Sequence, residues 1–121
     1  MIYTAIVEDN KKDAERLLSF QERYGKEHKL VQQCQWFSDA EKFLKSDTRR
    51  FDIVFMDPPY DNELECQVLE YLKDSTVVDE NTLIIVEADL QTDFGYLESL
   101  GYRLLRSKEY KTNKHVFLER V

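Results

Sequence analysis

Glycine, proline and cysteine are scarce in this chain of 121 residues, which has three Gly, two Pro and two Cys. Their scarcity excludes collagen-like and low-complexity chains, which are rich in Gly or Pro. The sequence has no run of 18 apolar residues and no signal peptide, so we expect no membrane association and a cytoplasmic location. Cys34 and Cys66 lack the CxxC spacing of metal sites. We therefore expect both thiols to be reduced and packed inside the fold.

Positive charge is also in deficit, because 17 Lys and Arg stand against 24 Asp and Glu, giving a net charge of −7. Affinity for nucleic acid rests mainly on clustered Lys and Arg, so stand-alone nucleic-acid binding is not expected. Hydrophobic residues make up 42% of the chain, which is enough for one folded domain over residues 1–121. No partner is indicated, and we expect a monomer or a weak homodimer.

The segment FDIVFMDPPY, at residues 51–60, organises the rest of the chain. Its apolar run at 53–56 is typical of a central strand buried on both faces of a parallel sheet. Asp57 ends this strand because Pro58 and Pro59 cannot continue the ladder of hydrogen bonds. In open α/β sheets that edge binds ligands. Alternatively, Asp57 only caps the next helix.

The remaining segments alternate between the two periodicities of strands and helices. Asp9 or Asn10 is a candidate N-cap for the first helix, and Gly25 and Gly101 are candidate helix ends. We expect strands at residues 2–7, 29–37, 53–56, 82–86, 102–110 and 115–121, and helices at 11–24, 38–48, 62–72 and 92–100.

These elements predict an α/β fold with three layers, a doubly wound sheet of flavodoxin-like or Rossmann-like type. The loop at residues 111–114 has the length of a hairpin, so the last strand must return antiparallel to the one before it. We expect the strand order 2-1-3-4-6-5, with the last strand inserted antiparallel beside residues 82–86.

The first half, residues 1–57, resembles the receiver domain of bacterial response regulators of the LytTR-associated type. The resemblance lies in IVEDN, WFSDAEKFL and FDIVFMD. It implies Mg²⁺ bound by Glu8 and Asp9 and a phosphoryl group accepted by Asp57. The lysine and the Thr or Ser of a receiver are missing, and only Lys114 could replace that lysine.

The second half is similar to the C-terminal half of S-adenosylmethionine-dependent ribosomal RNA guanine-N2 methyltransferases. The resemblance lies in DPPY, LIIVEAD and YKTNKHVFLER, within residues 51–121. It implies that Asp57 and Pro58 hold an exocyclic amine and that Tyr60 stacks on the base. A methyltransferase needs a glycine-rich first loop for its cofactor, whereas the first loop here is Glu8-Asp9-Asn10, so we expect S-adenosylmethionine not to bind.

Because both sites are incomplete, we predict a chimeric scaffold, engineered or recombined from a receiver-like half (1–57) and a methyltransferase-like half (58–121). We expect that it is not an enzyme. The carboxylates of Glu8, Asp9 and Asp57 repel one another unless protons or a cation neutralise them, which predicts weak Mg²⁺ binding. Two alternatives stay open. One is a receiver-like phosphoacceptor module, and the other is a methyltransferase-like fragment that acts on an RNA or DNA base amine.

Overall fold

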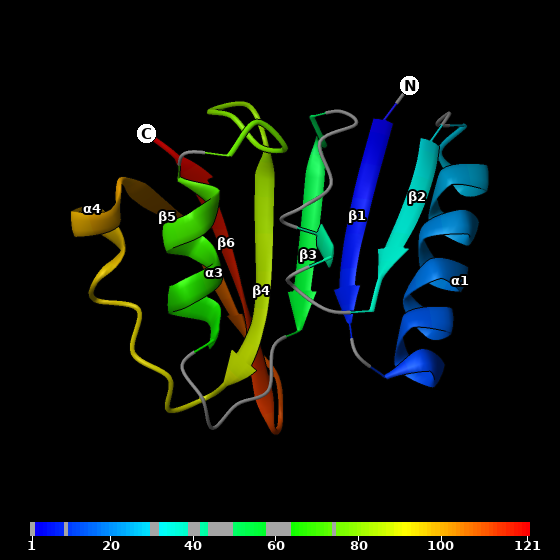
Figure 1. Cartoon of the computed structure of the whole chain (residues 1–121). Coiled ribbons are helices and arrows are strands. Elements are labelled where there is room, and N and C mark those ends of the chain that lie inside the picture. The colour runs from blue at the N-terminus through cyan, green and yellow to red at the C-terminus, as the bar shows by residue number, and fades with distance from the viewer. Residues whose placement is uncertain are drawn as a thin grey trace.

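The computed structural model describes residues 2–8, 10–29, 32–38, 42–43, 50–57, 64–73 and 75–121. They form a single sheet with helices on both faces (Figure 1). The strands are β1 (Ile2–Glu8), β2 (Gln32–Phe37), β3 (Ile53–Asp57), β4 (Leu83–Asp89), β5 (Tyr102–Glu109) and β6 (Asn113–Arg120). The described helices are α1 (Lys11–Glu27), α3 (Leu64–Leu72) and α4 (Leu97–Leu100).

The sheet has the order β2-β1-β3-β4-β6-β5, which confirms the predicted order and fold class. The pairs of β1 with β2, β1 with β3 and β3 with β4 are parallel, whereas β6 is antiparallel to both β4 and β5. The short β5–β6 turn forces this reversal, since a parallel return would need a long crossover. The order of the strands along the sheet reverses between β1 and β3.

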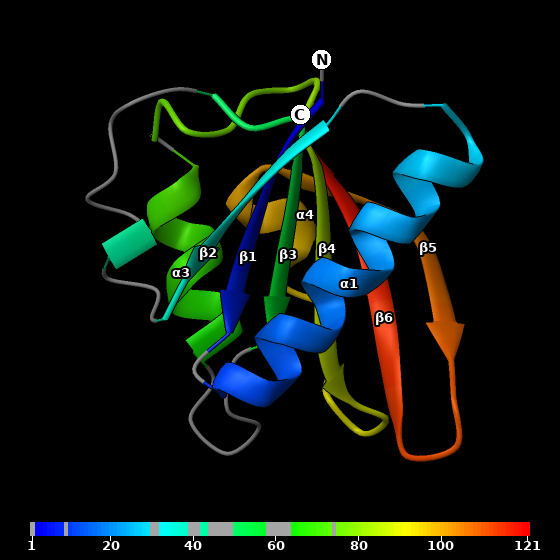
Figure 2. The ribbon, with the colours of Figure 1, turned by 90° about the vertical axis from the view of Figure 1, so that its right-hand side faces the viewer.

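Helices α3 and α4 lie on one face of the sheet, and α1 lies on the other (Figures 1 and 2). The main core fills the α3 side, where every second strand residue is buried. Its fully buried members include Ala5, Val54, Leu69, Leu72, Val77, Ile84 and Leu118. Three phenylalanines close one end of this core with ring centroids 5.2–6.0 Å apart, namely Phe37, Phe43 and Phe51.

The alternation of side chains along the strands places the polar strand ends on the face of α1. In β3, Val54 and Met56 belong to the core on the α3 side, so Phe55 and Asp57 point to the opposite face. The same alternation puts Glu8 of β1 and Glu87 of β4 on this second face. The sheet therefore presents acidic side chains from neighbouring strands at one edge and on one face.

Helix α1 is longer than predicted, because it continues through Gly25 to Glu27. The residue with a left-handed backbone is Lys29, with φ of 55°, and its N–H donates to Lys26 O at 3.4 Å. Since this turn occupies residues 28–29, the next strand begins at Gln32 and not at 29. At the other end, Asn10 is the N-cap, because its Oδ1 accepts the N–H of Asp13 at 3.2 Å.

Other local predictions have mixed outcomes. Gly101 ends α4 with a φ of 89°, as predicted. Cys34 and Cys66 are free thiols, each partly buried. Strand β6 begins at Asn113, two residues before the predicted start, because Tyr110 N–H already bonds Asn113 O across the turn at 2.8 Å. The predicted helix at 38–48 falls largely outside the described residues. Within the described ranges, no helix is long and apolar enough to cross a membrane.

Candidate active site

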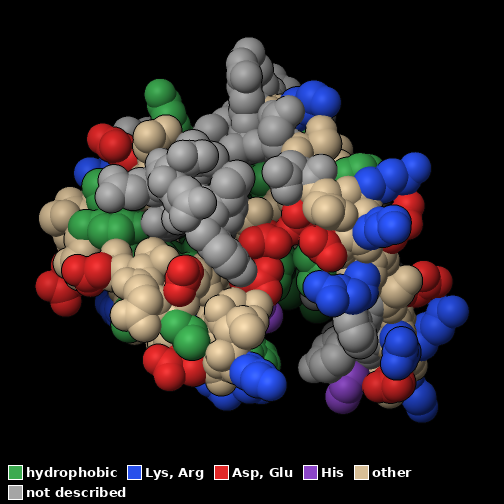
Figure 3. Space-filling model, turned by 90° about the horizontal axis from the view of Figure 1, so that it is seen from below, with side chains coloured by type: hydrophobic (Ala, Val, Ile, Leu, Met, Phe, Trp, Pro, Cys, Tyr) green, Lys and Arg blue, Asp and Glu red, His purple; other side chains and the backbone are tan. Residues whose placement is uncertain are grey.

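Two carboxyl groups meet where the order of the strands reverses. Glu8 and Asp57 end β1 and β3, and they are paired across these parallel strands. Asp13, in the first turn of α1, adds a third, so that carboxylate oxygens of Glu8, Asp13 and Asp57 lie within 4.8 Å of one another. Seen from this edge, acidic side chains gather beside a hollow in the surface (Figure 3). Such a switch point is where open α/β sheets bind ligands.

Glu8 is held in place from two sides. Its side chain is nearly enclosed, with 3% of its surface exposed, and its Oε1 accepts the N–H of Asn10 at 3.0 Å. Its backbone oxygen accepts the indole N–H of Trp36 in β2 at 2.7 Å. The same Asn10 starts α1, so the cap that fixes Glu8 also brings Asp13 over the strand ends.

The surroundings of Asp57 favour its neutral form. Burial raises the pKa of Asp57 to about 9, and hydrogen bonds with Glu8 and Glu87 and their negative charges act in the same direction. At neutral pH the carboxyl group of Asp57 therefore keeps its proton and donates it to a neighbouring carboxylate. Its other oxygen can still accept a hydrogen bond from an N–H group.

Glu87 behaves in the opposite way. A hydrogen bond from His115 lowers the pKa of Glu87 in spite of its partial burial, and Asp57 and Arg16 contribute in the same direction. His115 Nε2 lies 3.4 Å from Glu87 Oε1, and Asn113 Nδ2 donates to the same oxygen at 3.1 Å. Glu87 is thus the ionised partner of a neutral Asp57.

The structure brings together some of the predicted residues and not others. Glu8 and Asp57 lie side by side as expected. Asp9, Pro58 and Tyr60 are outside the described residues. Lys114 lies on the opposite face, where its ammonium group donates to Thr92 O at 2.7 Å and stands 5.5 Å from the centre of the Phe94 ring. The structure thus does not bring Lys114 to the carboxylates, and weak Mg²⁺ binding stays a prediction.

Four contributors were not among the predicted site residues: Asp13, Glu87, Asn113 and His115. Asp13 was missed because an acidic residue in the first turn of a helix is common and does not by itself indicate a site. His115 carried a usable signal, because the predicted strand order makes β6 the antiparallel neighbour of β4, in which Glu87 pairs with His115. Asn113 could have been found only with the correct start of β6.

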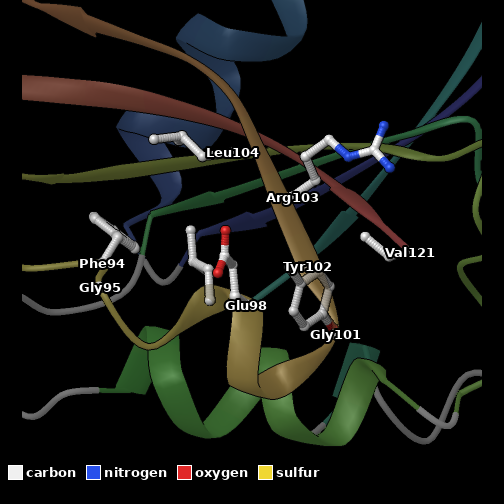
Figure 4. A pocket seen from close by; sticks show the side chains of 9 residues that line it. Phe94, Gly95, Glu98, Gly101, Tyr102, Arg103, Leu104 and Val121 are labelled. Carbon is white, nitrogen blue, oxygen red and sulfur yellow. The ribbon is translucent and has the colours of Figure 1, made fainter.

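A separate pocket of about 570 Å³ lies between α4 and β5, and none of the carboxylates above lines it. Figure 4 shows Phe94, Leu104 and Val121 around it, with the charged Glu98 and Arg103 at its sides. Its apolar lining and its place away from the reversal of strand order set it apart from the candidate site.

Comparison with known proteins supports a methylase-like fold. The chain is 27% identical over 78 residues to an uncharacterized methylase of Rickettsia prowazekii, a match that covers 64% of this chain and 32% of that protein. The chain thus spans about a third of the length of that curated relative. A conserved hypothetical protein of Streptococcus pyogenes has a similar structure, with a TM-score of 0.68, 24% identity, and coverage of 97% of this chain and 71% of that one.

Two further structures share the fold. A proposed methylase of Haemophilus influenzae has a TM-score of 0.61 and 23% identity over 97% of this chain and 71% of its own. Phosphoethanolamine N-methyltransferase 2 of Haemonchus contortus, solved with S-adenosyl-L-methionine, has a TM-score of 0.65 and 8% identity over 98% of this chain and 33% of its own.

These findings correct four expectations. The chain is not a chimera and not a receiver module, because one family profile runs through both halves, over residues 3–119. The expectation of no enzyme is wrong, since the relatives are named as methylases. The expectation that S-adenosylmethionine is not bound is contradicted by the neighbour that holds it in the same fold. The profile that matches is that of Conserved hypothetical protein 95, and the chain belongs to this family.

Proposed function

We propose that this chain carries the methyl-acceptor site of an S-adenosylmethionine-dependent methyltransferase that acts on an exocyclic amine of an RNA or DNA base. The observation that carries the proposal is the position of Asp57, which lies half-buried beside Glu8 at the point where the strand order reverses and opens the DPPY sequence. Burial and the neighbouring carboxylates raise its pKa to about 9. The relative named as a methylase supports the reaction class.

The strand order offers a reason for the missing glycine loop. Removing the first strand from the Rossmann order 3-2-1-4-5 and renumbering the rest leaves 2-1-3-4, which is the order of the parallel strands here. Strand β1 then corresponds to the second strand of such a fold, and its Glu8 to the acid that ends that strand. The strand that carries the glycine loop has no counterpart among the described strands, so Glu8-Asp9-Asn10 does not replace that loop.

Glu8 suits the cofactor in chemical terms. An acid at the end of the second strand of dinucleotide-binding folds accepts hydrogen bonds from ribose hydroxyls, and Glu8 is a carboxylate at such a position. We assign Glu8 to the ribose of S-adenosylmethionine. When bound, this cofactor supplies an electrophilic methyl group.

Asp57 suits the acceptor. A base amine has two N–H groups and one nitrogen lone pair, and transfer needs that lone pair aligned with the methyl group. A neutral Asp57 accepts one N–H through its carbonyl oxygen, while its own O–H stays on Asp57 and donates a hydrogen bond to Glu8 or Glu87. The carboxyl group thus orients the amine without placing a full negative charge in a half-buried site.

A nucleic-acid substrate is compatible with the charge of −7 because cations are concentrated in the β5–β6 hairpin. Arg103, Arg106 and Lys108 line β5 and Lys111 lies in the turn. Such a strip can contact phosphates locally, while the net negative charge keeps stand-alone affinity low.

Transfer of a labelled methyl group tests the proposal. The chain is incubated with S-[methyl-³H]adenosylmethionine and either unmodified ribosomal RNA or genomic DNA, and the nucleosides are then separated. We expect label on a base amine and its loss in Asp57→Ala, with Asp89→Ala as the control at the end of the neighbouring strand. Label on a ring nitrogen, on carbon or on neither nucleic acid would contradict the proposal.

A further inference from the structure

Two side chains at the start of β6 contact one carboxylate oxygen of Glu87. Asn113 Nδ2 donates to Glu87 Oε1 at 3.1 Å, and His115 Nε2 lies 3.4 Å from the same atom. His115 and Glu87 are opposite each other in the antiparallel pair of β4 and β6. Their side chains are 23% and 18% exposed, so the contact is partly shielded from water.

Two aromatic rings fix the orientation of His115. The Phe55 ring centroid lies 5.4 Å from that of the imidazole at 86°, and the Tyr110 centroid lies 4.8 Å away at 62°. Both are edge-to-face arrangements, which aromatic pairs favour. Since Phe55 belongs to β3 and Tyr110 to the hairpin turn, the imidazole is clamped between the central strand and the turn.

Glu87 in turn contacts Asp57. Met56 pairs with Val86 in the parallel ladder, so the next residues, Asp57 and Glu87, emerge side by side on the same face, and their carboxyl groups share a hydrogen bond. A chain of contacts therefore runs from β6 through β4 to β3. Glu87 Oε1 takes the hairpin contacts at one end, and Asp57 is at the other.

We propose that His115 and Asn113 are positioning residues, which hold the Glu87 carboxylate against Asp57 and thereby orient the Asp57 carboxyl group. The link to the methyl acceptor rests on the proposed function, whereas the orientation of Asp57 stands on these contacts alone. A purely structural role for His115 would stabilise the sheet without changing the environment of Asp57. A partly exposed pair of this kind contributes little to folding stability, so variants at His115 should stay folded.

NMR of aspartate labelled with ¹³C at Cγ tests the positioning at a fixed neutral pH. His115→Phe keeps a ring between Phe55 and Tyr110 but removes the donor, whereas His115→Gln returns an N–H donor. We expect the Asp57 resonance to shift in His115→Phe and in Glu87→Gln, and to return toward the wild-type position in His115→Gln. The Asp89 resonance is the internal control, and Trp36 fluorescence checks the fold.

An Asp57 resonance that stays in place in His115→Phe, or that shifts equally in His115→Gln, would overturn the proposal. Methyl transfer gives a second, separate readout. We expect kcat to fall about tenfold in His115→Phe with KM unchanged, because misorientation affects the transition state, and to recover in His115→Gln. Absence of transfer in the wild type would refute the proposed function, and the Asp57 resonance would still decide the positioning.

Discussion

Replacing Asp57 with Asn should change how the free energy of unfolding depends on pH. Asp57 has an ordinary pKa of 3.8 when unfolded and a pKa of about 9 when folded. A pKa raised by folding means that the folded state binds the proton more tightly. The stability from this proton is complete below pH 3.8 and is lost progressively as the pH rises to about 9.

The interval between these two pKa values limits the contribution of this proton to the free energy of unfolding. At about 1.4 kcal/mol for each pH unit, the upper limit is about 7 kcal/mol. Asp57 keeps part of its solvent exposure, and the screening by water reduces this figure to about 2–3 kcal/mol. In Asp57→Asn the amide N–H₂ can donate to Glu8 and Glu87 as the protonated acid does, and it does not ionise. We therefore expect the free energy of unfolding of the variant, relative to that of the wild type, to rise by about 2 kcal/mol from pH 5 to pH 9.

Urea unfolding at pH 5, 7 and 9, followed by the fluorescence of Trp36, measures this difference. Trp36 is the only tryptophan, and its indole N–H bonds the backbone of Glu8, so it reports on the site itself. Asp89→Asn is the control, because Asp89 ends the neighbouring strand and its side chain accepts the N–H of Gln91, away from Glu8 and Asp57. Parallel stability curves for the wild type and Asp57→Asn would refute a neutral Asp57.

Three further predictions concern stability. Leu69→Ala should lower the free energy of unfolding by about 2–5 kcal/mol in urea, because this fully buried side chain belongs to the core below α3; an effect as small as that of Leu105→Ala on the exposed strand would contradict the packing. Tyr102→Phe should cost about 1 kcal/mol, because its hydroxyl donates to the Leu69 carbonyl inside the protein, and an unchanged midpoint would argue against that bond. Gly101→Ala should cost about 1 kcal/mol through its φ of 89° and not through a clash, since the nearest neighbour of an added Cβ is Lys73 Cε at 3.8 Å; Gly101→Asn should then recover part of the loss in thermal unfolding.

Much of the fold was predictable because local patterns and chain geometry point the same way. The buried run at 53–56 and the proline pair place β3 at the centre of the sheet, and the short β5–β6 turn dictates the antiparallel insertion of β6. Helix ends were harder. Gly25 resembles a helix terminator in the sequence, yet the helix continues to Glu27, since a single glycine costs only about 1 kcal/mol within a helix.

The site was predictable only where it depends on strand ends. Glu8 and Asp57 were found because carboxyl ends of parallel strands meet at one edge. Asp13 reaches the same place through the N-cap of α1. His115 reaches it through the register of the antiparallel β4–β6 pair. A single sequence specifies both features only weakly. The expectation that S-adenosylmethionine does not bind was wrong. It took β1 as the strand that should carry the glycine loop, whereas we propose that β1 corresponds to the second strand of such a fold.

Titration of the ¹⁵N-labelled chain with S-adenosylmethionine, followed by NMR, tests the proposed cofactor site most directly. We expect shifts confined to the ends of β1 and β3, around Glu8 and Asp57, and we expect Glu8→Gln to abolish them while Glu98→Gln, in the pocket between α4 and β5, leaves them unchanged. Shifts that centre on that pocket, or a spectrum that does not change with cofactor, would contradict the assignment of the switch point as the cofactor and acceptor site.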